Sequence, residues 1–307
     1  MKSAVIAIDI SKKINVYDYI SKIKPLLDNF ANYDKVYCLL IDLLVDAGTI
    51  SLCDKEARVY ENMRTLINLG FNEKTTFLLQ SNISGLYQLS NELSTHIYIS
   101  KIIKNDFLIT SIQKNSINDI KLSSLINIAN IISSIIMVEA DDLYASKTFE
   151  PLYNFAKKIL ANYNESNDIK LFLPKIVLND ALTYSNLSAD GNAFISDKFD
   201  NDLDLCLTGE ELKRKINGIY TDPNHIKIND KGSVKNNPLF AFVDAICEDC
   251  DVQEFFGLNS IDELKYHYTQ GGIGDFKVKS MLYSSFIKKF NICSKEIDED
   301  YLKSRLK

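Results

Sequence analysis

The first eighty residues alternate between short apolar runs and a longer amphipathic stretch. Residues 3–10, 36–45 and 75–81 are apolar runs of strand length, bounded by polar residues or glycine. Residues 54–69 repeat apolar side chains every three to four positions, with an aspartate placed to cap a helix at its start and Gly70 placed to end it. Because strands that alternate with helices form parallel sheets with crossover helices, the pattern predicts an α/β fold with a Rossmann-like parallel sheet.

The rest of the chain is mainly helical in pattern. Residues 84–162 predict a helical insertion, and residues 175–180 return to strand character. Further helices are predicted at 210–217, 238–250, 261–268 and 277–290. The sequence therefore predicts two domains, an α/β domain over residues 1–200 and an all-helical C-terminal domain over residues 201–307.

Composition limits the classes of protein. The chain has 307 residues, of which 46% are apolar, and its net charge of −6 provides no global basic field for nonspecific binding of polyanions. The longest apolar stretch, residues 125–138, is too short and too rich in Asn and Ser to span a bilayer, so it predicts a buried helix. No secretory leader opens the sequence, and a cytoplasmic location without membrane association is expected.

The cysteines and histidines do not form a pattern typical of a metal site. The six cysteines are scattered and are expected to be reduced thiols. Cys247 and Cys250 form a CxxC pair, but no second Cys or His pair follows at zinc-ligand spacing, and His225 and His267 are isolated. No metal is expected.

Several ordered segments resemble one enzyme family. The sharpest are YTDPNHI (220–226), NPLFAFVDAI (237–246) and YTQGGIGDFKVK (268–279), and FLLQSNISGLYQLSNEL (77–93) and DGNAFIS (190–196) match less sharply. In order and spacing they resemble the bacterial-type tryptophanyl-tRNA synthetases, which are class I aminoacyl-tRNA synthetases. The resemblance covers about residues 4–293. It implies a Rossmann-like catalytic domain, a helical tRNA-contacting domain and a homodimer built through the region of residues 122–138.

The first ATP-binding motif of that family is changed in this chain. The resemblance implies a His-x-Gly-His-type motif, whose glycine lets adenine approach the backbone closely. The aligned residues here are Asn15, Val16, Tyr17 and Asp18. Tyr17 places a phenol ring beside the expected adenine, and Asp18 adds negative charge near the nucleotide.

The second motif is changed as well. The family's Lys-Met-Ser-Lys-Ser loop holds the departing phosphates with its lysines, and it aligns here with Phe194, Ile195, Ser196, Asp197 and Lys198. Both lysine positions are lost, and Lys198 lies one residue late. Removing one preorganised electrostatic partner costs roughly 3–4 kcal/mol of transition-state stabilisation. The sequence therefore predicts a paralogue that has lost its adenylation activity.

The tryptophan pocket is also altered. The aspartate that binds the indole N–H in the family aligns with about Ser133, and the family's Gly-Glu-Asp-Gln stretch falls near residues 145–148. The Asp-x-His-Ala strand end keeps its aspartate as Asp42 and loses its histidine. The candidate residues of a remodelled ligand pocket are Asp9, Ser11, Tyr17, Asp42, Gln80, Ser133 and Ser146.

Each candidate group also has a structural interpretation. Asp9, Ser11, Asp18 and Asp42 follow the first strands, where open α/β sheets bind ligands, or they are caps and solvated loop residues. Tyr17 gates a pocket or fills the former adenine space. The C-terminal lysines Lys277, Lys279, Lys288 and Lys289 contact tRNA phosphates or lie on a solvated helix face.

Three functional hypotheses remain. The first is a noncatalytic binding or regulatory paralogue whose partner is tRNA, an active synthetase or an amino-acid-like ligand, with no cofactor. The second is a repurposed enzyme that activates another amino or carboxylic acid, or that uses aminoacyl-tRNA in a biosynthetic pathway. The third is a divergent but active tryptophan–tRNA ligase. ATP and Mg²⁺ are expected only in the enzymatic alternatives.

Overall fold

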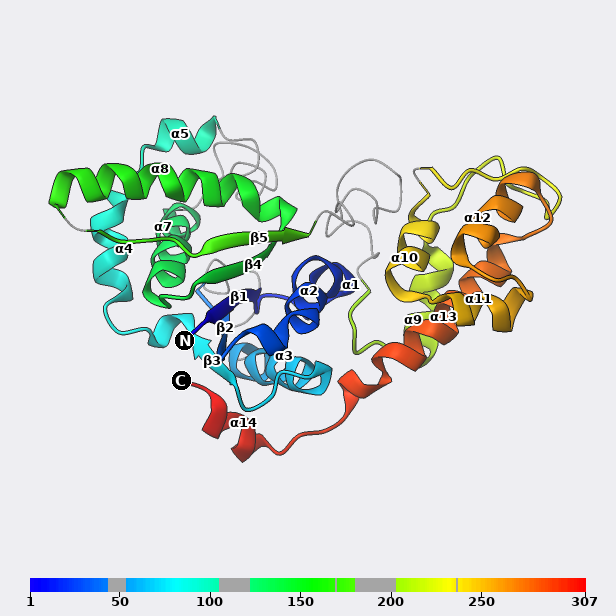
Figure 1. The fold of residues 1–307 in the computed structure, drawn as a ribbon, viewed down its shortest axis with the longest axis horizontal. Helices are drawn as coiled ribbons and strands as arrows, with labels where there is room; N and C mark the ends of the chain where they lie inside the picture. The colour runs from blue at the N-terminus through cyan, green and yellow to red at the C-terminus, as the bar shows by residue number, and fades with distance from the viewer. Residues whose placement is uncertain (44–53, 105–121, 169, 180–202, 236) are drawn as a thin grey trace. The chain divides into compact units, whose positions relative to one another are not determined.

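A computed structural model describes residues 1–43, 54–104, 122–168, 170–179, 203–235 and 237–307 (Figure 1). The chain folds into two compact units. Unit 1 comprises Met1–Ile14, Ser21–Asn179 and Glu296–Lys307, and unit 2 comprises Asn15–Ile20 and Asp180–Lys295.

Unit 1 is built on a five-stranded sheet with the strand order β3-β2-β1-β4-β5, in which every neighbouring pair is parallel. The strands are β1 (Ser3–Asp9), β2 (Lys35–Ile41), β3 (Thr75–Leu79), β4 (Asp142–Ser146) and β5 (Lys175–Asn179). Since β1 lies at the centre, the chain winds first to one side of it and then to the other. This arrangement confirms the predicted Rossmann-like fold class.

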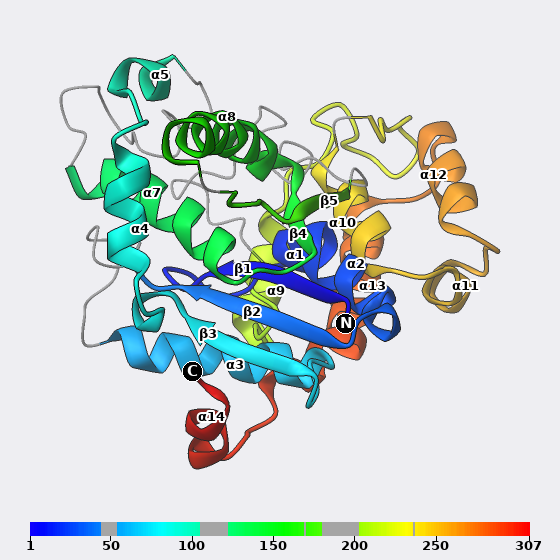
Figure 2. The same cartoon turned by 60° about the vertical axis from the view of Figure 1, so that its left-hand side comes forward.

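Helices cover both faces of the sheet. The helices α7 (Leu122–Met137) and α8 (Glu150–Asn167) lie on one face, and α3 (Lys55–Leu69) lies on the other (Figures 1 and 2). α3 ends at Gly70, whose positive φ of 117° stops the helix as predicted. The core beneath α7 and α8 is formed by buried side chains from strands and helices, among them Val5, Leu39, Ile135, Leu143 and Tyr153.

The helical insertion predicted over residues 84–162 contains a strand, β4, that the sequence pattern does not reveal. The insertion also holds α4 (Leu86–Ser94), α5 (Ile99–Ile103), α7 and the first part of α8. β4 carries polar groups whose partners are distant in sequence. Tyr33 Oη donates to Asp142 Oδ2 at 2.8 Å and lies 3.0 Å from Tyr144 Oη. These long-range contacts allow a strand to form where no continuous apolar run exists.

The longest apolar stretch forms α7, which is buried along much of its length, as expected. Among the described helices, none combines the length and the hydrophobicity that a membrane span requires.

Unit 2 is helical and is organised around α13 (Asp275–Phe290). The other helices are α1 (Val16–Asp18), α9 (Gly209–Gly218), α10 (Pro238–Ile246), α11 (Asp249–Phe256) and α12 (Ile261–Gln270). The prediction of one helix over residues 238–250 is wrong, because a capping box starts a new helix there. The Glu248 side chain accepts from the backbone of Asp251, and Asp251 Oδ2 accepts from the Glu248 N–H at 2.9 Å.

The predicted domain boundary at residue 200 lies outside the described residues. The first helical turn groups with unit 2, where the Val16 N–H donates to the Leu203 carbonyl at 2.9 Å. The assignment of residues 296–307 to the helical C-terminal domain is wrong, because this segment groups with unit 1. Its helix α14 (Glu299–Arg305) packs on α3, and the Lys307 N–H donates to the Phe77 carbonyl of β3 at 2.9 Å.

Arg305 connects this C-terminal segment to the start of β3. Its guanidinium donates to the carbonyl oxygens of Asn72 and Thr75, each at 2.8 Å, and pairs with Glu73 at 2.8 Å. We expect Arg305→Ala to lower the free energy of unfolding by about 2 kcal/mol, measured by urea denaturation, because the partly buried Thr75 carbonyl and the exposed Asn72 carbonyl lose a charged donor.

The matched control is Lys303→Ala on the same helix. Lys303 pairs with Glu299 across one turn, both side chains are about half exposed, and its ammonium lies 6.0 Å from the centre of the Tyr60 ring. This substitution should change stability by less than about 0.5 kcal/mol. Equal effects of the two substitutions would contradict the role of Arg305.

Candidate functional site

The carboxyl ends of β1, β2 and β3 bring three of the predicted pocket residues to one edge of the sheet. Asp9 is the last residue of β1, and Asp42 and Gln80 directly follow β2 and β3. Asp9 Oδ1 accepts from the Ser11 N–H at 2.8 Å, so this pair closes the turn after β1. This geometry agrees with the interpretation of Asp9 and Ser11 as residues that cap the end of a strand, not as ligand-binding groups.

Asp42 is a buried carboxylate whose charge is paired. Its Oδ1 accepts from the Ser81 N–H at 2.9 Å, and its Oδ2 lies 2.6 Å from the Lys55 ammonium at the start of α3. Because Lys55 compensates its charge, Asp42 does not provide a free anion for a ligand.

The inner face of α7 is polar and buried at the same edge. Asn127, Asn130, Ser133 and Ser134 are all buried on this helix, and Gln80 is buried opposite them. Asn127 Nδ2 donates to the Leu43 carbonyl at 3.3 Å, directly after Asp42 in the chain. Gln80 Nε2 donates to Ser134 Oγ at 3.2 Å. Thus the ends of β2 and β3 are both tied to α7.

Three polar atoms of this face have no hydrogen-bond partner among the residues that the structure describes. They are Gln80 Oε1, Asn130 Oδ1 and Ser133 Oγ. Buried polar atoms are nearly always paired in native proteins, and each unpaired atom costs about 1–3 kcal/mol. Since open α/β sheets bind ligands at the carboxyl ends of their strands, these three atoms are candidates for contact with a ligand.

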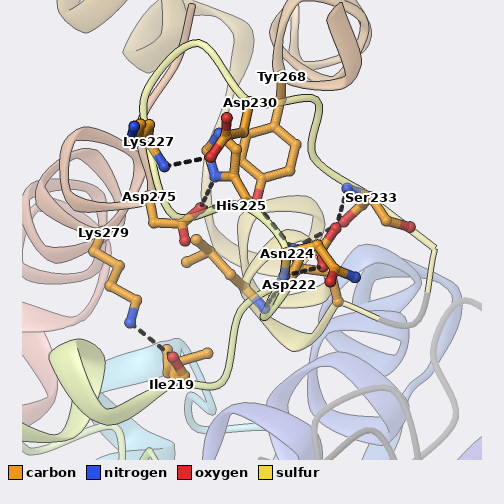
Figure 3. Close-up of polar contacts among 12 residues, drawn as sticks. Ile219, Asp222, Asn224, His225, Lys227, Asp230, Ser233, Tyr268, Asp275 and Lys279 are labelled. Atoms are coloured by element: carbon orange, nitrogen blue, oxygen red, sulfur yellow. Dashed lines mark hydrogen bonds and ion pairs between the residues drawn. The ribbon is translucent and has the colours of Figure 1, made fainter. Parts of the chain in front are cut away.

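A second polar cluster lies in unit 2 and joins two segments that are far apart in the sequence (Figure 3). Asp275, at the start of α13, accepts from Tyr268 Oη at 2.7 Å and lies 3.1 Å from His225 Nδ1. Burial raises the pKa of the Tyr268 hydroxyl, so it remains a donor to the carboxylate. Asp222 accepts from the backbone N–H groups of Asn224 and Ser233 at 2.9 and 2.8 Å. The segments 220–233 and 268–275 therefore hold each other in place.

Comparison with known proteins identifies the family. No protein-family model matches the chain. A tryptophan–tRNA ligase of Clostridium longisporum is 30% identical over 261 residues, which cover 84% of this chain and 69% of that protein. A tryptophan–tRNA ligase of Streptococcus agalactiae is 27% identical over 68% of this chain and 60% of that protein. The chain belongs to the tryptophan–tRNA ligase family.

Solved structures of tryptophanyl-tRNA synthetases share the fold. The structure from Mycoplasma pneumoniae has a TM-score of 0.79 at 14% identity and covers 99% of this chain and 91% of that one. The structure from Campylobacter jejuni in complex with ADP and tryptophan has a TM-score of 0.73 at 16% identity, covering 95% and 87% of the two chains. The tryptophan–tRNA ligase fold is thus retained at very low sequence identity.

The residues aligned with the first ATP-binding motif of the ligase family form the start of unit 2. Asn15 caps α1 by accepting from the Asp18 N–H at 2.8 Å, and the Tyr17 side chain is buried, with 6% exposed. The second motif, Phe194 to Lys198, lies outside the described residues. Ser146, at the end of β4, shares a hydrogen bond of 2.8 Å with Thr148.

The four lysines predicted to contact tRNA in a ligase-like helical domain make contacts within unit 2. Lys279 donates to the carbonyls of Asn217 and Ile219 at 2.7 Å each, and burial lowers its pKa (Figure 3). Lys288 pairs with Asp251 at 3.0 Å, and this hydrogen bond raises the pKa of the lysine. Lys289 donates to the Ile246 carbonyl at 3.2 Å, and Lys277 lies 4.7 Å from the centre of the Phe256 ring. Contact with tRNA stays a prediction.

The sequence pattern missed several residues of the site formed by the inner face of α7 with Asp42, Lys55 and Gln80, which we call the α7 site. Lys55, Asn127, Asn130 and Ser134 contribute to it, although only Asp42, Gln80 and Ser133 were predicted. Asn127, Asn130 and Ser134 recur at helical spacing inside an apolar stretch, and this recurrence is the signal that indicates a buried polar face. Within the part of the chain that the structure describes, no group of three or more His, Cys, Asp and Glu side chains is placed to hold a metal ion.

The cluster around Asp275 predicts the effect of a small substitution. Tyr268→Phe removes the hydroxyl that donates to Asp275 and that also lies 3.4 Å from Asn237 Nδ2. We expect the free energy of unfolding to fall by about 1–3 kcal/mol, measured by urea denaturation, since a partly buried carboxylate loses a donor.

Tyr266→Phe is the control, because Tyr266 lies on the same helix with an exposed side chain. It should be neutral to within about 0.5 kcal/mol. If Tyr268→Phe were equally neutral, the cluster would not stabilise unit 2.

Proposed function

We propose that this member of the tryptophan–tRNA ligase family does not form an aminoacyl-adenylate and acts as a noncatalytic protein that binds a small ligand. The observation that carries the proposal is the buried ring of Tyr17, at the position where the family resemblance implies a glycine. A glycine leaves room for adenine against the backbone, whereas a phenol ring packed into a core occupies that volume.

Loss of electrostatic stabilisation supports the same conclusion. Adenylate formation needs fixed positive charge where negative charge develops on the phosphates. The sequence has Phe194 and Asp197 where the family resemblance implies the two lysines of the second motif. An anion beside a triphosphate adds repulsion to the lost attraction.

The ligand site in this proposal is the polar inner face of α7 together with Gln80. Ser133 stands at about the position where the resemblance implies the indole-binding aspartate, so the face presents hydroxyl and carboxamide groups and no carboxylate of its own. The buried carboxylate that the structure describes at this edge, Asp42, is neutralised by Lys55. The site therefore favours a small molecule with hydrogen-bonding groups over an indole.

A homodimer and a macromolecular partner are further parts of the proposal. Leu122 and Ile126 lie one turn apart on α7 with 70% and 49% of their surface exposed, which supports docking of a second copy of the chain there. We expect a dimer by sedimentation equilibrium and a shift toward monomer for Ile126→Glu. Unchanged sedimentation of that variant would remove α7 from the interface. A tRNA or an active synthetase remains the candidate partner of unit 2.

A divergent but active ligase is the second candidate function, favoured by the 30% identity to the Clostridium longisporum ligase. It requires ATP and Mg²⁺ to bind despite Tyr17. A repurposed enzyme that activates another acid also requires ATP and Mg²⁺ to bind despite Tyr17.

ATP–pyrophosphate exchange distinguishes these functions. With tryptophan we expect exchange at least roughly 10⁴-fold below that of the Clostridium longisporum ligase, because two phosphate-holding lysines are lost at about 10²-fold or more each. A panel of the other amino acids should give no signal above background. Exchange with tryptophan at a rate near that of the control would overturn the proposal in favour of the active ligase, and exchange with another acid would favour the repurposed enzyme.

A further inference from the structure

The unpaired atoms of the α7 site define the chemistry of its ligand. Residues 127, 130, 133 and 134 fall within an arc of about 120° on one helix and span about 10 Å along it. Gln80 faces this arc through its hydrogen bond to Ser134. All five side chains are buried, so an unpaired atom among them is shielded from bulk water.

The hydrogen-bond network fixes which atoms of the two carboxamides are unpaired. Ser134 Oγ donates to the Ile131 carbonyl at 2.9 Å, so it accepts from Gln80, which must present its nitrogen and leave Oε1 unpaired.

Asn127 is oriented in the same way by its neighbour. Its Nδ2 donates to the Leu43 carbonyl, so its Oδ1 faces Asn130 and accepts from Asn130 Nδ2 at 3.5 Å. This assignment leaves Asn130 Oδ1 unpaired. The site consequently offers two carbonyl-type acceptors and the hydroxyl of Ser133.

We propose that this face of α7 binds a small molecule through an uncharged primary carboxamide. A primary carboxamide has two N–H donors and one carbonyl acceptor, which complement the two acceptors and the one hydroxyl of the site. The inference deepens the proposed function and rests on it, since it names the ligand class of the same site.

Charged groups fit the site less well. A carboxylate would place its oxygens against Gln80 Oε1 and Asn130 Oδ1, and the Lys55 ammonium is already held by Asp42. An ammonium group would be buried in this site with no carboxylate available to pair with it, because Asp42 is already paired with Lys55. An indole has a single N–H and leaves at least one of the two acceptors unpaired.

Matched pairs of probes test the ligand class. The intact protein is titrated by isothermal calorimetry with glutamine and asparagine, with glutamate and aspartate, and with tryptophan. We expect saturable binding of at least one amide and at least tenfold weaker binding of its acid counterpart. Equal binding of amide and acid, binding of tryptophan alone, or no binding by either amide would overturn the inference.

Two substitutions locate the binding in the α7 site. Ser133→Ala removes a hydroxyl that makes no hydrogen bond with any described residue, so the melting temperature without ligand should not fall while the amide binds about tenfold more weakly. Gln80→Met removes an acceptor with little change of shape and should weaken amide binding at least as much. Ser285→Ala, at a buried serine of unit 2, should leave the affinity unchanged.

The binding measurements test the ligand class, and the exchange measurement tests the noncatalytic function, so each proposal can be contradicted without the other. Equal loss of affinity in Ser133→Ala and Ser285→Ala would show that binding is not at α7 and would overturn the inference. Tryptophan binding without pyrophosphate exchange would also overturn the carboxamide, yet it would leave the noncatalytic function in place. Exchange activity would overturn the function itself.

Discussion

Polar side chains buried beneath α7 cost free energy unless their atoms are paired, and this constraint governs the carboxyl edge of the sheet in unit 1. Most of the pairs there join elements that are far apart in the sequence. Asp42 accepts from the backbone after β3 and pairs with Lys55 of α3, while Asn127 reaches the carbonyl that follows Asp42. The ends of β2 and β3, the start of α3 and the middle of α7 are therefore held by one set of polar contacts. The atoms left over from this set are the ones that define the proposed ligand.

The sharpest sequence similarity to the ligase family lies elsewhere, and its physical role is folding. Tyr268 is fully buried between the His225 and Phe240 rings, with centroid distances of 4.5 and 4.6 Å, and it donates to Asp275. A Cβ on Gly232 would lie 2.2 Å from the Tyr268 ring, so only glycine fits there. Strong similarity at such positions shows that the scaffold is the same. It carries no information about adenylation, which depends on other residues.

Much of the fold could be predicted from local patterns, and the misses have physical causes. The strands β1, β2, β3 and β5 were found because each contains a short continuous apolar run, which is typical of strands in a parallel sheet covered by helices. β4 was missed because Asp142 and Tyr144 depend on Tyr33, more than a hundred residues away. The break before α11 was missed because a Glu248–Asp251 capping box outweighed an apolar pattern that continued through it.

The candidate site was only partly predictable for a similar reason. Asp42 was identified by the family resemblance and by its place near the carboxyl ends of the first strands, where open α/β sheets bind ligands, and Gln80 was named with it as a pocket candidate. Which of them is free to bind a ligand depends on partners such as Lys55 and Ser134, and no local pattern indicates those pairings. The contacts of the four lysines of unit 2 were also not predictable from local patterns. Lys279, for example, contacts the end of α9, about sixty residues earlier in the chain.

The separation of these interactions explains how a ligase scaffold can keep its fold while its chemistry changes. Unit 2 is held by the Asp275 cluster, and the last segment of unit 1 is held by Arg305 against β3. Neither set of contacts includes Ser133, whose hydroxyl makes no hydrogen bond within the described part of the chain. A substitution at that position therefore changes what the site can bind without removing a bond that stabilises the fold. Positions of this kind are where ligand specificity can diverge at the lowest cost in stability, and three unpaired atoms on one buried face are the expected result of such divergence toward a ligand that supplies their partners.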